Sequence, residues 1–514
     1  PDDVYGTYSE RCRREKIRYR MMKAYNDIQT SRLSAPNLFY LLLFIGLGGI
    51  CGSLMGGNLI ISGVIAILPF AFILGVYILR MPVTLLYVIF IINYFIMGIT
   101  RYLPLEGISV LMDLLYALSL LMICLHGILF HNIEWKRAIN TLTITSFIWA
   151  IYCVAQLANP TGVLEGWILS RGLIINGLII SVIAALLCTR YKTLKTLLFL
   201  LSVLTLLAFG KALIQKYRGF DSYELEWLKG NTTHIIHSGI RYFSFFTDAS
   251  NLGSNMGAAI LIFGISALHL RNRALSTYYI IVAFIATYTL FLTGTRGAII
   301  VPLAGLALYT IISKQAKTMV AGGLMLISVY IFFAFTMIGQ NNSMIRRMRT
   351  AFSPSKDASL NVRKENQRKL GEYLKYRPFG EGLGLSGDGL GVKVSKRFTT
   401  SIPTDSWYVK IWVETGVVGL VLYMGMILIT IGRGAWILMF RIRDPELKSL
   451  LTGLLCGIFG MFVSAYGNSF WGQFPTMIIS FMGMTFVLNG EYFDKEIHQD
   501  KQISINTSDK QTEK

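Results

Sequence analysis

Long apolar runs, separated by short segments rich in polar residues, glycine or proline, make up most of the chain beyond residue 37. A helix needs about 20 mainly apolar residues to cross a hydrocarbon core about 30 Å thick. The runs approach this length, so the pattern predicts about fourteen membrane-spanning helices in an all-α polytopic bundle. The expected spans are 38–54, 58–79, 82–99, 108–130, 140–158, 166–188, 194–210, 249–270, 276–293, 297–313, 317–338, 407–432, 446–466 and 472–489.

Basic residues alternate between the connecting segments. The segment 1–37 carries a group of arginines and lysines (Arg11, Arg13, Arg14, Lys16, Arg18, Arg20, Lys23 and Arg32). Every second loop after it is also basic, at Arg80, Lys136–Arg137, Arg190–Lys195, Arg271–Arg273, Lys314–Lys317 and Arg433–Lys448. The positive-inside rule places these segments in the cytoplasm, together with both termini. The polar tail 490–514 is expected to be disordered.

Composition excludes a soluble protein. Hydrophobic residues make up 54% of the chain and charged residues only 15%, with a mean hydropathy of +0.54. The net charge of +20 is not gathered into a basic and aromatic module, so we expect anionic lipid and an anionic substrate, and no nucleic acid, as partners. The six cysteines form no C-x-x-C pair, and five of them lie in apolar stretches, which argues against a disulfide framework or a zinc site.

Two loops, 211–248 and 339–406, are longer than a simple connection requires, and the alternation places both outside the cytoplasm. Long loops of this kind are commonly functional. Residues 339–405 contain thirteen Lys and Arg against six Asp and Glu. The excess favours anion binding, with a merely solvated basic loop as the alternative.

A few charges lie inside expected spans, six to eight residues from the outer boundary: Asp113, Arg171 and Glu414. Asp248, Arg241 and Arg296 lie in the same boundary layer. Such charges are costly in a membrane, so each suggests function. Two interpretations remain open: a structural ion pair between Asp113 and Arg171, or a polar cavity that opens outward. A transporter would instead favour midplane charges on repeated halves, which the sequence does not show.

Three segments recur together in a known family. Arg241-Tyr-Phe-Ser-Phe-Phe-Thr-Asp248-Ala-Ser-Asn251 opens one span, and Leu292-Thr-Gly-Thr-Arg296-Gly-Ala298 forms a turn between two others. The third runs from Asp357 through Arg363, Arg377-Pro-Phe-Gly380 and Thr404-Asp405-Ser-Trp-Tyr408 to Glu414. In this order, across about 240–420, the segments resemble the bacterial O-antigen polymerase and O-antigen ligase superfamily of polytopic glycosyltransferases.

The resemblance implies a GT-C-like bundle in the bacterial inner membrane that transfers glycan on the periplasmic side. A sugar chain on undecaprenyl diphosphate would move to an acceptor hydroxyl, without a nucleotide sugar, cofactor or metal. The implied partners are the lipid-linked oligosaccharide, the growing glycan acceptor, the lipid bilayer and a chain-length regulator.

The resemblance also implies roles for individual residues. Arg241, Arg296 and Arg363 would hold the departing diphosphate, because a guanidinium can bind phosphate oxygens in a bidentate manner, with an ordinary interfacial anchor as the alternative for each. Asp405 would act as the general base, with simple capping of the next helix as the alternative. The ligase branch carries a histidine at the position of Asp405, and 339–406 contains no histidine. A polymerase is therefore favoured, with a ligase or a polysaccharide-lipid transporter as alternatives.

The remaining candidates are expected to bind substrate: Arg377, Asp248, Asn251, Arg171, Glu414, Trp407 and Tyr408. Glu414 is also a second candidate for the base, with a buried structural hydrogen-bonding role as the alternative. Two other motifs carry less weight. Gly382 to Gly387 spells G-x-G-x-x-G, but without a preceding strand it does not predict dinucleotide binding, and a loop whose backbone approaches sugar or phosphate fits better. His234 and His237 have the spacing of one helical face but lack a third ligand, so no metal site is expected.

Overall fold

The computed structural model describes the chain from residue 72 onward with short gaps, and a few positions before it. The described residues are 44, 47–49, 72–103, 107–230, 234–236, 239–352, 358–387 and 390–512. The chain forms two compact units, Pro1–Met81 and Pro82–Lys514, and the second contains all the elements discussed below. The expected spans 38–54 and 58–79 fall largely outside the described residues.

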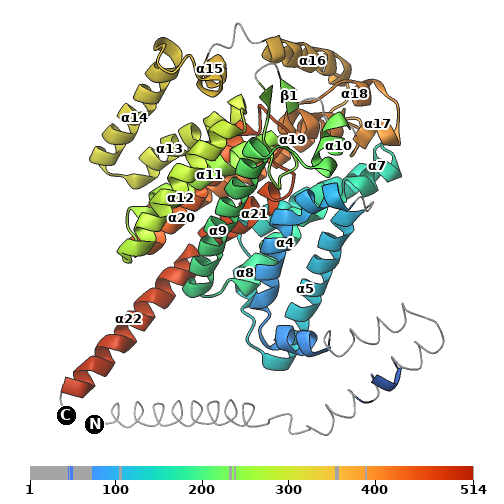
Figure 1. Cartoon of the computed structure of the whole chain (residues 1–514). Coiled ribbons are helices and arrows are strands. Elements are labelled where there is room, and N and C mark those ends of the chain that lie inside the picture. The colour runs from blue at the N-terminus through green and yellow to red at the C-terminus, as the bar shows by residue number, and fades with distance from the viewer. Residues whose placement is uncertain are drawn as a thin grey trace. The chain divides into compact units, whose positions relative to one another are not determined.

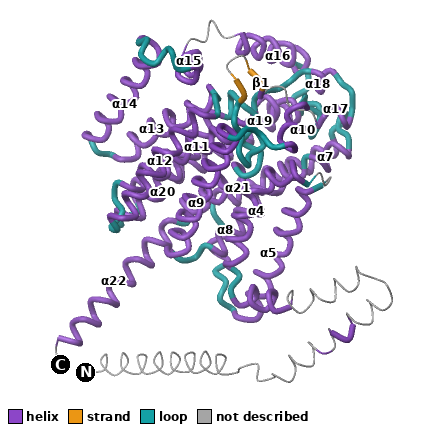
Figure 2. The backbone as a smooth tube through the Cα atoms, in the orientation of Figure 1, coloured by secondary structure: helices purple, strands orange, loops and turns teal. Residues whose placement is uncertain are grey.

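The second unit is built from helices (Figures 1 and 2). The long helices are α4 (Val83–Tyr102), α5 (Ile108–Phe130), α6 (Thr141–Ala155), α8 (Gly177–Leu187), α9 (Tyr191–Tyr217), α11 (Ala249–Ala267), α12 (Arg273–Leu292), α13 (Ile300–Ser313), α14 (Ala316–Phe335), α19 (Trp407–Phe440), α20 (Pro445–Ser464), α21 (Thr476–Leu488) and α22 (Gly490–Thr512). The connections contain α7 (Leu164–Leu169), α10 (Ser222–Gly230), α15 (Ser343–Arg349), α16 (Ala358–Leu374), α17 (Leu390–Val394), α18 (Phe398–Ser401) and the paired strands β1 (Ile235–Ile236) and β2 (Gly239–Ile240).

Within the described residues, nine helices are long and apolar enough to cross a membrane. Two shorter apolar helices, Gly172–Leu187 and Thr476–Leu488, occupy further expected spans. The predicted all-α polytopic membrane fold is thereby confirmed.

The centre of the bundle is formed by α11, α20 and α21. Helix α11 packs against α12, α13 and α20, and nearly all of its residues are buried. Its sequence is less apolar than that of a lipid-facing span, with Asn251, Ser254 and Asn255 on it. Because protein surrounds α11, these polar side chains lie inside the bundle rather than facing hydrocarbon, and Asn255 donates a hydrogen bond to the Thr476 hydroxyl at 2.6 Å.

The periphery shows the opposite composition. In the apolar 18-residue stretch of α14, only 6% of the residues are buried inside the protein, and in that of α5 only 17% are. Their large apolar side chains, such as Leu114, Ile128 and Leu324, are exposed to the surroundings. An apolar helix with so little protein contact is suited to face lipid.

The two ends of the bundle differ. One end carries α7, α10, the two strands and α15 to α18, so both long loops gather there (Figure 1). The other end carries the basic connections, where Lys195 contacts Glu446 at 2.7 Å and Arg271 contacts both Asp444 and Glu446. These pairs join connections far apart in sequence, which agrees with the alternation of basic and non-basic loops.

The expectation of a disordered tail is wrong for the described residues. Residues 490–512 form α22, which packs against α9, α19, α20 and α21. Phe493 and Ile497 are buried, and the Asp494 carboxylate accepts hydrogen bonds from the backbone N–H groups of Arg443 and Asp444. The first turns are thus anchored by tertiary contacts that a polar average composition does not reveal.

Candidate functional site

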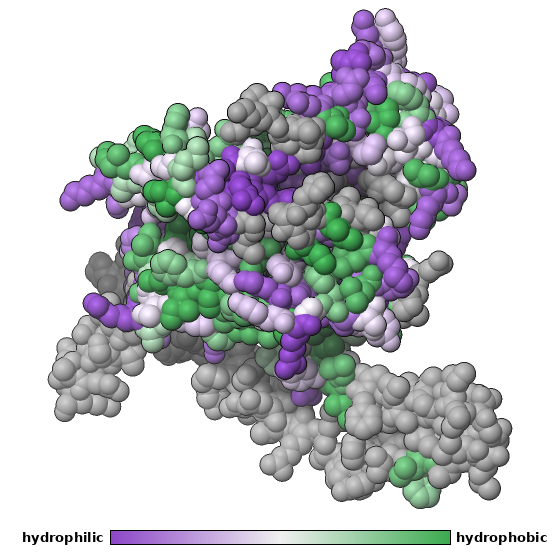
Figure 3. Space-filling model, turned by 45° about the horizontal axis from the view of Figure 1, so that its top comes forward, coloured by the Kyte–Doolittle hydropathy of each residue, from purple (hydrophilic) through white to green (hydrophobic). Residues whose placement is uncertain are grey.

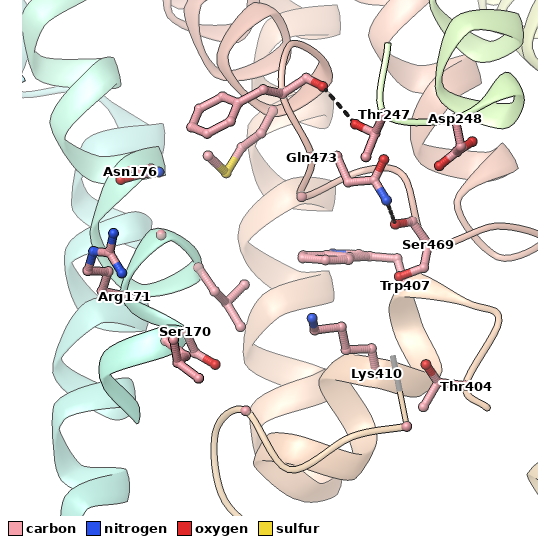
Figure 4. Close-up of a pocket in the computed structure, with 18 of the residues that line it drawn as sticks. Ser170, Arg171, Asn176, Thr247, Asp248, Thr404, Trp407, Lys410, Ser469 and Gln473 are labelled. Atoms are coloured by element: carbon pink, nitrogen blue, oxygen red, sulfur yellow. Dashed lines mark hydrogen bonds between the residues drawn. The ribbon is translucent and has the colours of Figure 1, made fainter. Parts of the chain in front are cut away.

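A polar cavity of about 660 Å³ lies at the end of the bundle that carries the long loops. Hydrophilic residues gather over this end, as Figure 3 shows with the end turned toward the viewer. The lining includes Asp113, Ser170, Arg171, Asn176, Thr247, Asp248, Gly384, Gly387, Thr404, Asp405, Trp407, Lys410, Ser469, Gln473, Phe474 and Met477. Two facing walls can be distinguished (Figure 4).

The first wall is formed by the starts of α11 and α19. Asp248 is the N-cap of α11, and its carboxylate accepts hydrogen bonds from the backbone N–H groups of Ser250 and Asn251. Asp405 has a left-handed backbone, with φ of 52°. Its side chain is 41% exposed and lies 3.9 Å from the Nε of Arg363.

The alternative role of Asp405 as a helix cap is wrong. Helix α19 begins after Ser406, and its N-cap side chain makes no capping hydrogen bond. The Asp405 carboxylate is therefore not engaged by the helix start, whereas the Asp248 carboxylate is. Of the two carboxylates on this wall, Asp405 is the better placed to accept a proton.

The second wall comes from α5 and the segment before α8. Asp113 accepts a hydrogen bond from the Arg171 Nε at 2.7 Å. Residues Gly172–Asn176 form a π-helical turn, a feature frequent at functional sites. The two interpretations of Asp113 and Arg171 therefore hold together, because the residues form an ion pair and also line the cavity.

The cavity lining includes buried polar atoms that have no hydrogen-bond partner among the described residues. Among them are the Oδ1 of Asn176, on the second wall, and the hydroxyl of Thr404, on the first. A buried polar group left without a partner costs free energy, roughly 1–3 kcal/mol. Both groups therefore have unused hydrogen-bonding capacity at the cavity lining.

Trp407 and Lys410 lie between the walls, one turn apart on α19 (Figure 4). The Lys410 Nζ lies 3.8 Å from a Glu414 carboxylate oxygen. Sequence reasoning missed Lys410, although it is a charge inside an expected span, four residues before Glu414. It also missed Asn176 and Thr404, which carry no charge and have no distinctive spacing.

Four arginines gather beside the first wall, and we call them the arginine cluster: Arg241, Arg296, Arg347 and Arg363. Arg241 donates to the Thr295 hydroxyl at 2.6 Å and to the Ser250 hydroxyl at 3.2 Å. Burial lowers the pKa of Arg241; the Asp248 carboxylate opposes this shift, and the positive charges of Arg296 and Arg363 add to it.

The fourth member was not expected from the sequence. Arg347, on α15, donates from its Nε to the Gly294 carbonyl, and Gly294 also packs against Arg241. Arg296 donates to the Thr350 hydroxyl at 3.1 Å. The cluster thus joins the turn after α12 to both parts of the long loop. The sequence signal that could have identified Arg347 is the basic run Arg346-Arg347-Met-Arg349.

Arg377 and Glu414 are not brought to the cavity surface. Arg377 pairs with the buried Glu381, which also accepts a hydrogen bond from Arg397 at 2.8 Å. Glu414 is fully buried and accepts a hydrogen bond from the Ser386 hydroxyl at 2.6 Å. These contacts hold the loop of the G-x-G-x-x-G motif against α19.

The anchoring of this loop depends on a break in α19. Gly416 has φ of 71° and ψ of −174°, and the backbone of Gly380 packs against it. The carbonyls of Val413 and Glu414 accept hydrogen bonds from the N–H groups of Glu381 and Gly382. Gly384 and Gly387 then line the cavity with backbone. The approach of this backbone to sugar or phosphate stays a prediction.

Asn251 and Tyr408 also lie away from the cavity lining. Asn251 is fully buried and bonds to the segment that follows α20, including the Phe474 carbonyl at 2.9 Å. The Tyr408 hydroxyl donates to the Phe462 carbonyl. Both side chains connect helix starts to neighbouring elements.

His234 is part of a small aromatic cluster. Its ring stacks on Trp227, with centroids 5.0 Å apart. Burial lowers the pKa of His234 to about 4, and the charge of Arg241 contributes to the shift. The helical interpretation of the two histidines is wrong, because Ile235 and Ile236 between them form strand β1; His237 lies outside the described residues.

Taken together, the fold and the site define a multi-pass membrane protein with a one-sided polar cavity beside an arginine cluster. Residues 281–424 match the family model described as O-antigen ligase. This match confirms the resemblance to the O-antigen polymerase and ligase superfamily and indicates a glycosyltransferase-like enzyme. No curated protein matches the chain. The matched region contains Arg296, Arg347, Arg363, Asp405 and Lys410, whereas the second wall lies outside it.

Proposed function

We propose that the protein polymerises undecaprenyl-diphosphate-linked oligosaccharide repeat units into a surface polysaccharide at the periplasmic face of the bacterial inner membrane. One observation carries this proposal: the arginine cluster lies beside a polar cavity on which the Asp405 carboxylate is partly exposed. Anion-binding and proton-accepting groups therefore adjoin the same space.

The geometry suits displacement of a diphosphate. The acceptor hydroxyl oxygen would bond to the donor anomeric carbon while the bond from that carbon to the diphosphate oxygen breaks. Asp405 would take the hydroxyl proton, and the diphosphate would leave with the electron pair. The arginine cluster would stabilise the charge that develops on it, which is a large catalytic contribution in a partly dehydrated site.

The second wall offers contacts for sugar. Asn176, Arg171 and Asp113 present amide, guanidinium and carboxylate groups that exchange hydrogen bonds with hydroxyls. The Thr404 hydroxyl adds another hydrogen-bonding group from the first wall, and the Trp407 ring lies between the walls. We assign this wall to the sugar residues next to the reacting centre.

The choice of polymerase rests on Asp405. The ligase branch carries a histidine at this position. This chain has an aspartate there instead, which favours the polymerase branch. A ligase that moves glycan to lipid A core or protein is the second candidate, because the matched family model is described as O-antigen ligase. A transporter of lipid-linked polysaccharide is the third, and it predicts carrier movement without glycosidic bond formation.

Reconstitution of the purified protein with a defined undecaprenyl diphosphate oligosaccharide tests the proposal. A ladder of products, each longer by one repeat unit, is expected. Transfer only to added lipid A core would favour the ligase, and outward movement of unaltered donor would favour the transporter. Chelator should not change the rate.

The same assay tests the arginine cluster. Arg296→Ala should reduce chain growth by about 10²-fold or more, because it removes a cation near the developing charge. Arg368→Ala is the matched control, since Arg368 lies on α16 in the same long loop but pairs with Glu365 and Glu372 on the surface. Full-length product from Arg296→Ala would remove Arg296 from the cluster's proposed role.

A further inference from the structure

A second cavity, of about 360 Å³, lies at the opposite end of the bundle. It is bounded by the start of α6, by α19 and by the junction of α21 with α22. Its lining residues are Lys136, Ile139, Asn140, Thr141, Ile144, Arg433, Ile437, Leu488, Asn489, Glu491, Tyr492 and Lys495. We call it the basic cleft.

Three cations in the basic cleft, Lys136, Arg433 and Lys495, form no ion pair among the described residues. The Arg433 guanidinium lies over the Trp436 ring, 4.3 Å from its centroid, so its contact is aromatic and not ionic. Nearby Arg137 and Arg441 do have carboxylate partners. Arg137 is held by Glu134 at 2.8 Å and by the Tyr492 ring at 4.6 Å. Arg441 lies 3.7 Å from Glu491, which is the one acidic residue on the lining.

The backbone adds to the positive field of the basic cleft. Helix α6 begins here, and the positive end of a helix dipole lies at its N-terminus. Asn140 and Thr143 form a capping box, so the first turn is held in place without a ligand. The three cations therefore surround a preformed helix start.

Apolar side chains continue from the basic cleft along the bundle. Ile139 is 72% exposed and Ile144 is 50% exposed. Ile148 and Ile151 follow on the same face of α6 at helical spacing, and they are 49% and 54% exposed. The positive charge at the end of α6 matches the headgroup of an anionic phospholipid. The exposed apolar surface along the helix matches its acyl chains.

We propose that the basic cleft binds an anionic phospholipid, with the headgroup phosphate between Lys136, Arg433 and Lys495 and an acyl chain along the apolar face of α6. Basic pockets between spanning helices are suited to such headgroups. A free phosphate ion would not require the apolar face, and this favours a lipid. The proposal is independent of the proposed glycosyltransferase activity.

The site has a structural consequence. Helices α6 and α19 pack together, and the far end of α6 contacts the long loop and α19 near the polar cavity. There, Tyr152 donates to the Thr415 carbonyl at 2.6 Å, and Gln156 donates to the Phe379 carbonyl at 3.1 Å. A lipid bound across α6 and α19 would therefore stabilise the pair of helices that supports the loop.

Native mass spectrometry of the full chain in a non-ionic detergent tests the proposal. The probes are phosphatidylglycerol and phosphatidylcholine with identical acyl chains. Wild type should bind its first phosphatidylglycerol more tightly than its first phosphatidylcholine. Combining Lys136→Gln, Arg433→Gln and Lys495→Gln should weaken phosphatidylglycerol binding by about 100-fold, because each cation near a membrane surface contributes about fivefold.

Matched variants keep the test specific. Arg190→Gln, Lys192→Gln and Lys317→Gln remove the same charge from exposed positions outside the basic cleft and should leave binding unchanged. Combining Ile144→Ser with Ile148→Ser should weaken phosphatidylglycerol binding without altering the cations. The melting temperature of each variant without added lipid should equal that of wild type, which excludes misfolding.

Three results would overturn the proposal. The first is equal phosphatidylglycerol binding by the cleft variant and wild type. The second is equal affinity of wild type for phosphatidylcholine. The third is displacement of phosphatidylglycerol by millimolar inorganic phosphate, with no effect of the serine variants, since that pattern describes an anion site without a lipid chain.

Discussion

Asp405 combines three properties: a left-handed backbone, partial exposure at the cavity and no part in capping. Asn and Asp tolerate the left-handed region better than most residues. A substitution of Asp405 by asparagine therefore preserves the backbone and removes only the charge and the proton acceptor.

Asp405→Asn should lower the rate of chain growth by about 10²–10⁴-fold if the carboxylate is the general base. The measurement is the initial rate of repeat-unit addition by the reconstituted protein. Glu365→Gln removes a carboxylate from the exposed face of α16 and should keep the wild-type rate. A rate within about threefold of wild type for Asp405→Asn would contradict the assignment.

Asn176 provides a separate test of the sugar-binding wall. Its Oδ1 has no hydrogen-bond partner among the described residues, so Asn176→Leu should leave the melting temperature unchanged or raise it. The apparent KM for lipid-linked oligosaccharide should increase by about tenfold, the value of one hydrogen bond to a buried group.

Ser480 supplies the control for Asn176. Its hydroxyl is also buried without a hydrogen-bond partner, but it lies within α21 and is not part of the cavity lining. Ser480→Ala should change neither KM nor chain growth. An unchanged KM for Asn176→Leu would mean that the second wall does not contact the sugar.

At the scale of elements, the break in α19 is the feature that most directly connects fold and site. A Cβ at Gly416 would lie 1.9 Å from the Pro378 carbonyl oxygen, and the positive φ disfavours any side chain there. The close approach lets the loop that lines the cavity dock into the helix. A glycine at this position is therefore required by geometry on both counts.

Gly416→Ala should destabilise the protein by about 2–4 kcal/mol, the combined cost of a left-handed alanine and of a steric clash. Thermal unfolding in detergent measures this as a lower melting temperature. Gly425→Ala on the same helix has no neighbouring atom within 4 Å of the added Cβ and should be neutral or slightly stabilising. Equal melting temperatures for the two variants would contradict the role of the break.

Hydropathy alone predicts most spans because the membrane requires continuous apolar helices. It fails where tertiary contacts replace the membrane as the surroundings of a helix. The expected span 166–188 is divided into α7, a π-helical turn and α8, since Arg171 and Asn176 line the cavity instead of facing lipid. Helix α22 forms because buried Phe493 and Asp494 anchor a segment that is polar on average.

The same distinction applies to the site. Arg241, Arg296 and Arg363 were identified from local motifs, and Arg241 and Arg296 are also permanent charges in the boundary layer. Their convergence depends on how the long loop folds back over the turn after α12, which no local pattern specifies. Arg377 and Glu414 follow the same charge rule, yet they are used to anchor the loop, with Glu381 and Ser386 as partners.

At the scale of the whole molecule, the two ends have different chemistry, and the difference makes a prediction about orientation. The polar cavity and both long loops share one end, while the basic connections share the other. Short basic loops are retained in the cytoplasm during insertion. The cavity end should therefore face the periplasm, as the proposed transfer from undecaprenyl diphosphate requires.

Single cysteines at the two ends test this orientation. Tyr376→Cys replaces a side chain that is 84% exposed on the cavity end, and Arg273→Cys replaces an exposed residue at the basic end. In intact spheroplasts, a membrane-impermeant maleimide should label Tyr376→Cys at once and Arg273→Cys only after permeabilisation. Wild type, with its native cysteines, gives the background. Labelling of Arg273→Cys alone before permeabilisation would mean that the orientation is the reverse of the predicted one. Labelling of both positions before permeabilisation would mean that the two ends are not on opposite sides as predicted. Either result would contradict the periplasmic location of the proposed chemistry.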